Sequence, residues 1–113
     1  FDFYQTESRE GEGLHIGGHN SFEKVYALDP FAGMSDDAKK HIIGVQCNMW
    51  SEYLPTMAAV EKMLLPRLAA LSEVQWSTDR RDAETIRLRM DTLRKFYDYH
   101  GWNYAPYYFD GRK

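Results

Sequence analysis

Cysteine is almost absent from this sequence of 113 residues, and the single Cys47 excludes both an internal disulfide and a cysteine-rich zinc site. No apolar run approaches the length of about 18 residues that a membrane-spanning helix requires, which argues against a transmembrane segment. The 14 Lys and Arg residues form no long basic tract and are outnumbered by 17 Asp and Glu residues, which argues against binding to nucleic acid. The motifs G-x-G-x-x-G and G-x-S-x-G are missing, so nothing supports nucleotide binding or serine hydrolysis.

Aromatic residues, by contrast, are abundant, because six Phe, three Trp and eight Tyr make up 15% of the chain. This content is too high for a disordered segment and indicates a packed domain. The chain opens with Phe-Asp-Phe-Tyr-Gln, which is typical of the inside or end of a strand. Without an initiating Met or a signal peptide, the sequence is either a mature form or, as we expect, a piece of a longer protein.

The order of the predicted elements favours an α/β fold. We expect a strand at about 1–5, loop and short helices over 6–41, a buried strand at about 42–48, and helices at about 57–76 and 82–100. Pro66 lies inside the first long helix and predicts a kink or a break near Leu64. The two strands flank a helical crossover, so we expect them to pair in parallel. Because two parallel strands do not form a stable sheet alone, the pattern indicates part of a larger sheet.

Three residues at the ends of these strands are candidates for binding a sugar. Trp50 and Glu52 directly follow the second strand and, in an extended chain, would point to the same side. An indole can pack on the C–H face of a pyranose, and a carboxylate accepts hydrogen bonds from hydroxyls. Asp2 lies in the aromatic first strand, where a carboxylate is costly to bury unless it is paired or functional. On spacing alone, a core tryptophan with a capping glutamate and a strand-end aspartate remain the commoner interpretations.

Other polar residues support no metal or cofactor site. His15 and His19 are four residues apart, but they lie in a glycine-rich loop and no third ligand is evident, so we expect neither a metal ion nor a cofactor. Glu61, Arg67 and Glu73 lie in the first long helix, where structural ion pairs or caps are the default interpretation.

The segment GVQCNMWSEYLPTMAAVEKMLLPRLAALSEVQW resembles the last strand and helix of the catalytic barrel of family 20 glycoside hydrolases, the β-N-acetylhexosaminidases. The family pattern is close to G-x-Q-A-N-L-W-T-E-Y, a spacer, and Y-M-x-x-P-R-x-x-A-L-A-E-x-x-W. The matching residues are Gln46, Asn48, Trp50, Glu52, Tyr53, Met63, Pro66, Arg67, Ala70, Leu71, Glu73 and Trp76. Cys47 replaces the usual alanine. The resemblance implies the C-terminal portion, about the last two βα units, of a TIM (β/α)8 barrel.

The resemblance also implies roles for the three candidate residues. Trp50 would form a wall of the subsite for the N-acetyl sugar, and Glu52 would bind its 4-hydroxyl, with the 6-hydroxyl as a further candidate. Asp2 would match the aspartate of the seventh barrel strand, which contacts sugar hydroxyls. The family tyrosine that binds the acetamido carbonyl would precede Asp2 by two residues and is missing from this sequence.

The family mechanism is substrate-assisted and retaining, and an Asp-Glu pair on the fourth barrel strand performs the chemistry. No Asp-Glu dipeptide occurs in the 113 residues, so we expect no catalytic residue in this chain and no activity from the chain alone. The implied substrate is a carbohydrate with a terminal β-N-acetylhexosamine, and the implied compartment is periplasmic or extracellular.

The predicted chain would also need the rest of the barrel, or a self-associated partner, to cover its strand edges. Two alternatives remain open from the sequence, a non-catalytic sugar-binding module and a structural or interaction domain. Burial of Trp50 beneath the chain's own tail would favour the structural domain.

Overall fold

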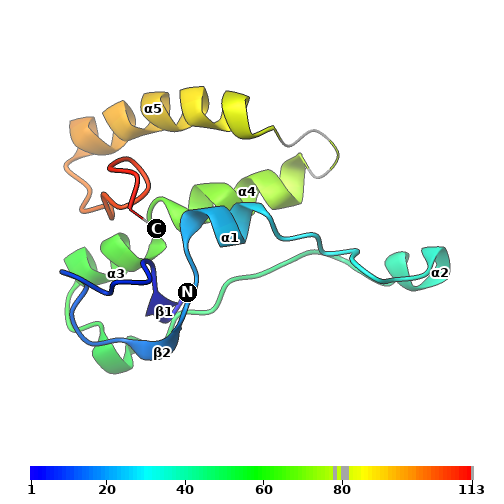
Figure 1. Cartoon of the computed structure of the whole chain (residues 1–113), viewed down its shortest axis with the longest axis horizontal. Helices are drawn as coiled ribbons and strands as arrows, with labels where there is room; N and C mark the ends of the chain where they lie inside the picture. Colours follow the sequence, from blue (N-terminus) through cyan, green and yellow to red (C-terminus); the bar gives the residue numbers. More distant parts are fainter. Residues whose placement is uncertain (78, 80–81, 113) are drawn as a thin grey trace.

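The computed structural model describes residues 1–77, 79 and 82–112. The described chain is rich in helices and contains a small parallel sheet (Figure 1). Its elements, in order, are β1 (Phe3–Tyr4), β2 (Ile16–His19), α1 (Phe22–Tyr26), α2 (Asp36–Lys39), the 3-10 helix η1 (Ser51–Tyr53), α3 (Met57–Leu64), α4 (Arg67–Trp76) and α5 (Ala83–His100).

Side-chain caps and one proline set the ends of the long helices. The Thr56 side chain accepts a hydrogen bond from the Ala59 amide at the start of α3. Pro66 separates α3 from α4, since proline cannot continue the backbone hydrogen bonding of a helix. Asp82 caps α5 through the amides of Glu84 and Thr85, and Gly101 ends it with a φ of 67°. These helices lie within the ranges 57–76 and 82–100 that the sequence predicts, with the break at the expected place.

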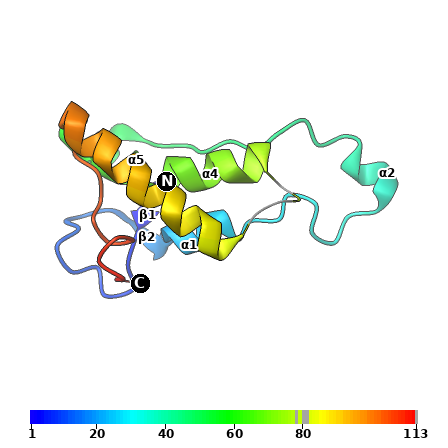
Figure 2. The same ribbon diagram turned by 90° about the horizontal axis from the view of Figure 1, so that it is seen from above.

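The hydrophobic core lies between three helices. Figures 1 and 2 show α5 lying over α4 and α1. Each helix contributes one pair to the same buried cluster: Phe22 and Val25 from α1, Ala70 and Leu71 from α4, and Ile86 and Met90 from α5. Because α1 follows β2 and α4 follows the segment 42–50, this core joins the two parts of the chain that carry the candidate site.

The sheet differs from the one expected from the sequence. β1 pairs in parallel with β2, in a segment expected to be loop, while residues 42–48 form no strand. The prediction of a strand at 42–48 is therefore corrected, although the segment does run beside the start of β1. Arg67 donates hydrogen bonds to the carbonyls of Phe1 and Phe3, so these two backbone acceptors are bonded to a side chain in the described structure.

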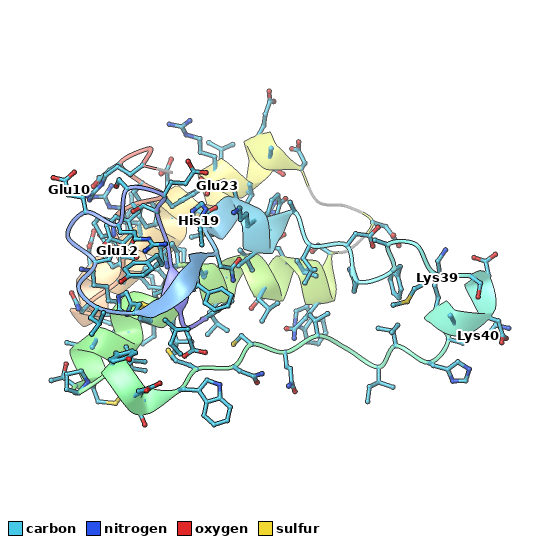
Figure 3. The ribbon with its side chains drawn as sticks, turned by 60° about the horizontal axis from the view of Figure 1, so that its bottom comes forward. Glu10, Glu12, His19, Glu23, Lys39 and Lys40 are labelled. Atoms are coloured by element: carbon cyan, nitrogen blue, oxygen red, sulfur yellow. The ribbon has the colours of Figure 1, made fainter. Side chains whose placement is uncertain are left out.

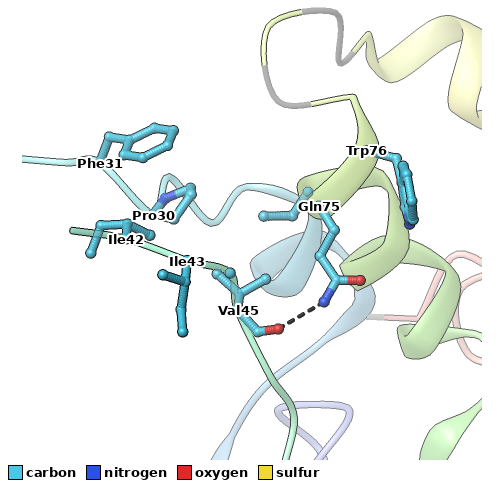
Figure 4. A pocket seen from close by; sticks show the side chains of 9 residues that line it. Pro30, Phe31, Ile42, Ile43, Val45, Gln75 and Trp76 are labelled. Atoms are coloured by element: carbon cyan, nitrogen blue, oxygen red, sulfur yellow. Dashed lines mark hydrogen bonds between the residues drawn. The ribbon is translucent and has the colours of Figure 1, made fainter. Parts of the chain in front are cut away.

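An arm, formed by residues 28–50, projects from the helical body and carries α2 at its tip (Figures 1 and 2). Apolar residues on the returning half of this arm remain uncovered by the described chain, and Ile43 is fully exposed. A cavity of about 420 Å³ lies between the arm and the end of α4, where Gln75 donates a hydrogen bond of 2.7 Å to the carbonyl of Val45 (Figure 4). The arm therefore presents apolar surface of a kind that proteins usually bury.

The segment after α5 packs back on the body. The Ala105 amide donates a hydrogen bond of 2.9 Å to the carbonyl of Leu65 at the α3–α4 junction. Ala105 and Tyr107 are both buried. Among the described residues, no helix is both long enough and apolar enough to cross a membrane.

Burial of Tyr97 predicts a loss of stability in alkaline solution. Desolvation raises the pKa of Tyr97 from 10.0 to about 12, so the folded chain keeps this proton where the unfolded chain loses it. The stability gained is complete below pH 10 and is lost as the pH rises through 12. Between pH 9 and pH 12, the free energy of unfolding of Tyr97→Phe should therefore fall by about 1 to 2 kcal/mol less than that of the wild type. Urea unfolding at the two pH values measures both losses.

The comparison with Tyr97→Phe isolates this effect from the other groups that titrate in the same range. Burial lowers the pKa of Arg67 to about 10, so the titration of Arg67 increases the stability of the folded chain as the pH rises from 10 to 12. This effect opposes that of Tyr97, but it is the same in both proteins because both contain Arg67. Equal alkaline losses in the two proteins would contradict the assignment.

Candidate functional site

Asp2 and Trp50 are far apart in the sequence but adjacent in the structure. Oδ1 of Asp2 accepts a hydrogen bond of 2.6 Å from the backbone amide of Trp50. Just before this contact, the Phe1 amino group donates to the carbonyl of Asn48. Residues 1–2, just before β1, and residues 48–50 therefore lie side by side.

The segment 45–50 alternates between the helical core and the open face, as an extended chain does. Val45 and Cys47 are half-buried and pack against the core cluster. Gln46, Asn48 and Trp50 are exposed on the other side, and the Trp50 side chain has 67% of its surface exposed. The exposed face thus combines one indole with two carboxamides. Nε2 of Gln46 donates a hydrogen bond of 3.3 Å to Oδ1 of Asn48.

A cavity of about 400 Å³ borders this face. Its lining includes Asp2, Asn48 and Trp50, together with Asn20 and Lys24 from the other side. A carboxylate, carboxamides and an ammonium group can all hydrogen-bond hydroxyls, while an exposed indole offers a flat apolar surface. The surface of this cavity therefore has the chemistry that a sugar ring requires.

Glu52 does not share a side with Trp50 in the way that the sequence analysis expected. Trp50 is extended, with φ −106° and ψ 138°, but Glu52 lies inside the 3-10 helix η1, where residues two apart no longer face the same way. Glu52 is exposed and does not line the cavity of about 400 Å³. A smaller cavity is also lined by Asp2 and Trp50, and Glu52 is not part of that lining either. Of the three candidates, the structure brings together Asp2 and Trp50, while Glu52 lies exposed in η1 two residues further along the chain.

Arg67 connects the candidate site to α4 through backbone carbonyls, where the sequence predicts only a structural ion pair or a cap. Its side chain is fully buried, and its guanidinium donates to the carbonyls of Phe1 and Phe3, on either side of Asp2. Burial lowers the pKa of Arg67 to about 10, while the nearby carboxylates of Glu12 and Asp2 act against this shift. The available signal was a charged residue directly after Pro66, between the apolar runs Met63–Leu65 and Leu68–Leu71. Glu73 and Glu61, in contrast, make the structural contacts expected of them, with Arg89 and Asn103.

A buried carboxylate holds the loop that follows β1. Glu12 accepts hydrogen bonds from the amides of Gln5 and Thr6 and from the Thr6 hydroxyl, at 2.6–2.7 Å. Figure 3 shows Glu12 within this loop, far from Lys39 and Lys40 on α2. Since all three donors belong to the two residues that follow β1, Glu12 fixes the loop to the end of this strand.

The two histidines of this region make separate contacts. The His15 ring packs edge-on against Tyr4, with 5.3 Å between ring centroids. The His19 ring lies between the Gln5 carbonyl and the Lys24 ammonium group, at 3.3 and 2.9 Å. Within the part of the chain that the structure describes, no three His, Cys, Asp or Glu side chains gather as metal ligands would.

Comparison with known proteins identifies the family of the chain. The family model described as glycosyl hydrolase family 20, catalytic domain, matches residues 1–79, which include Asp2, Trp50, Glu52 and Arg67. A β-hexosaminidase of Porphyromonas gingivalis is 33% identical over 105 residues, covering 91% of this chain and 13% of the relative. A β-N-acetylhexosaminidase of Cellulomonas fimi is 32% identical over 97 residues, covering 83% and 20%. A β-hexosaminidase of Vibrio furnissii is 30% identical over 73 residues.

The chain spans only 13–20% of the length of the first two of these relatives. The family expected from the sequence motif is confirmed, and the α/β barrel expected from it is the fold of that catalytic domain. The chain therefore belongs to glycosyl hydrolase family 20, through residues of the family's catalytic domain.

Proposed function

We propose that this chain supplies the last two strand–helix units of a family 20 barrel and a sugar-binding surface formed by Asp2, Trp50 and Glu52. The complete barrel hydrolyses terminal β-linked N-acetylglucosamine or N-acetylgalactosamine. The observation that carries the proposal is the hydrogen bond of 2.6 Å between Oδ1 of Asp2 and the Trp50 amide. In the proposed barrel, this contact would lie where the strand that carries residues 42–48 ends, which is the end at which barrel enzymes place their active sites.

Trp50 is not covered by the chain's own tail. In the described structure 67% of the Trp50 surface is accessible and the tail packs elsewhere, at the α3–α4 junction, so the burial that would favour a purely structural role does not occur there. In this proposal the indole packs on the C–H face of the sugar, and the carboxylates of Asp2 and Glu52 accept hydrogen bonds from its hydroxyls.

Two further observations support a larger barrel around this chain. The curated relatives are five to eight times longer than the part that matches, as the coverage of 20% and 13% shows. The returning half of the arm, residues 42–50, carries a fully exposed Ile43 and forms no strand in the described structure. Further strands of a barrel would pair with this segment and cover its apolar side chains.

The chemical step in this proposal uses groups outside the 113 residues. The 2-acetamido oxygen of the substrate attacks the anomeric carbon, the leaving group departs with a proton, and water then opens the oxazolinium intermediate with net retention. An Asp-Glu pair orients the acetamido group and transfers the proton, and no such dipeptide occurs in this chain. Asp2, Trp50 and Glu52 hold the sugar ring during both steps.

The experiment compares the chain alone with the chain inside a complete barrel. The chain alone should not hydrolyse p-nitrophenyl N-acetyl-β-glucosaminide, because it has no Asp-Glu pair. In a grafted enzyme, the chain replaces the corresponding segment of the Cellulomonas fimi relative, with which it shares 32% identity. The grafted enzyme should hydrolyse the substrate, whereas the same relative with the segment deleted should not.

Either of two results would contradict the proposal. Turnover by the chain alone, above a matched blank, would show that the catalytic groups lie within it. A folded grafted enzyme without turnover would reject the role of this segment in the barrel. If that enzyme is inactive while N-acetylglucosamine still changes the tryptophan fluorescence of the chain, a non-catalytic sugar-binding module is the better interpretation.

A further inference from the structure

Arg67 is the most extensively bonded buried charge in the described chain. Its guanidinium donates hydrogen bonds to the backbone carbonyls of Phe1 at 2.6 Å, Phe3 at 3.2 Å, Asn20 at 2.9 Å and Met63 at 2.6 Å. These carbonyls belong to the β1 segment, the residue after β2, and α3. One side chain of α4 therefore ties together three other parts of the chain.

The hydrogen bonds to Phe1 and Phe3 hold the backbone on both sides of Asp2. With both flanking carbonyls fixed, the Cα–Cβ bond of Asp2 keeps one direction relative to α4. That direction places Oδ1 on the Trp50 amide, at 2.6 Å. A continuous set of contacts thus runs from Arg67 through the β1 backbone to Asp2 and on to Trp50.

The geometry requires the planar fork of arginine. A lysine ammonium is a compact charge with three donors and cannot reach four carbonyls that surround a flat guanidinium. Burying a charge at this position is costly, and an apolar residue of similar volume would fill the space but leave the carbonyls of Phe1, Phe3 and Asn20 without this donor. The charge therefore supplies something besides packing, namely a fixed orientation of the backbone around Asp2.

We propose that Arg67 is a positioning residue that sets Asp2 and Trp50 in register for sugar binding, acting through the carbonyls of Phe1 and Phe3. The hydrogen bonds described above support the orientation of Asp2 by themselves. The effect of that orientation on sugar binding rests on the proposed function. Arg67 itself lies beneath β1, fully buried, and does not touch the sugar.

The test measures the Asp2–Trp50 contact in the full chain by NMR. An amide proton that donates to a carboxylate shifts when that carboxylate ionises, so the Trp50 amide should follow the acid titration of Asp2. The nearest other charged groups are the Phe1 amino group, 4.0 Å from Oδ2 of Asp2, and Arg67. Arg67→Lys should remove at least half of the shift, and Asp2→Asn should remove all of it. Val74→Ala, a buried change on the same helix away from β1, should leave it unchanged.

A full Trp50 shift in a folded Arg67→Lys chain would overturn the proposal. If Arg67→Lys does not fold, the wild-type chain decides, because bound Nη protons should exchange slowly and give cross-relaxation to residues 1–3. Rapidly exchanging Nη protons without such cross-relaxation would also overturn it.

Kinetics of the grafted enzyme separate the two proposals. At equal folded fraction, Arg67→Lys should lower kcat/KM at least tenfold, while Val74→Ala should change it less than twofold. Loss of the NMR shift with unchanged kinetics would keep the positioning of Asp2 and reject its role in sugar binding. A grafted enzyme that is inactive before any substitution rejects the proposed function and leaves the NMR result standing.

Discussion

Replacing Trp50 by alanine, or Glu52 by glutamine, should lower kcat/KM of the grafted enzyme about 100-fold or more. Trp50→Ala removes the flat apolar surface on which the sugar ring packs, and Glu52→Gln removes a charged acceptor for its hydroxyls. A sugar contact that strengthens in the transition state contributes on the order of a few kcal/mol, which corresponds to a loss of this size. Initial rates with p-nitrophenyl N-acetyl-β-glucosaminide provide the measurement.

Matched substitutions on α5 serve as controls for these two variants. Tyr99 is an exposed aromatic residue with 86% of its surface accessible, and Glu84 is an exposed carboxylate in the first turn of the helix. Tyr99→Ala and Glu84→Gln should leave kcat/KM within about twofold of the unsubstituted grafted enzyme. Unchanged kinetics in both Trp50→Ala and Glu52→Gln would remove these residues from the proposed binding surface.

Met90→Ala should cause a large loss of stability. Met90 is 1% exposed and reaches from α5 into the cluster shared with α1 and α4. Truncation of such a side chain costs about 2 to 5 kcal/mol, through lost burial and the cavity left behind. Because whole domains are stable by only about 5 to 15 kcal/mol, a large part of the stability depends on this contact.

Urea unfolding, followed by circular dichroism, measures this loss. Met57→Ala is the matched control, since Met57 is 71% exposed in the first turn of α3. Its midpoint should stay close to that of the wild type. Equal midpoints for Met90→Ala and Met57→Ala would show that α5 does not stabilise the body through this cluster. That result would show that α5 contributes little to the stability of residues 1–79, the part of the chain that matches the family.

The helices could be predicted from the sequence because their signals are local. Ser21, Ser35, Thr56 and Asp82 each cap the helix that follows, through their own side chains. Such signals depend on a few neighbouring residues and on no distant contact.

The strands could not be predicted in the same way, because a strand exists only with a partner. The apolar run from Ile42 to Val45 has the composition of a buried strand, but in the described chain no neighbour pairs with it. β2 has the opposite character, since two of its four residues are glycine and its sequence is typical of a loop. At Gly18, φ is 124° and an added Cβ would lie 2.9 Å from the Phe3 ring, so only glycine allows β2 to approach β1.

The candidate site was partly accessible to sequence reasoning. Asp2 and Trp50 stood out because each is unusual for its place, and the structure puts them in contact. The role of Arg67 depends on carbonyls up to 66 residues away, which no local pattern encodes. The position of Glu52 was missed because the turn into η1 changes the direction of side chains after Trp50.

The arm has a consequence for how this chain tolerates change in length. Its tip, α2, contains no buried residue, while the segments on either side are held by the core through Val25 and Val45. An insertion or deletion at the tip would therefore alter neither the spacing of Asp2 and Trp50 nor the packing of the helices. In the described chain, the turn around α2 is therefore a place where a peptide tag would leave the contact between Asp2 and Trp50 intact.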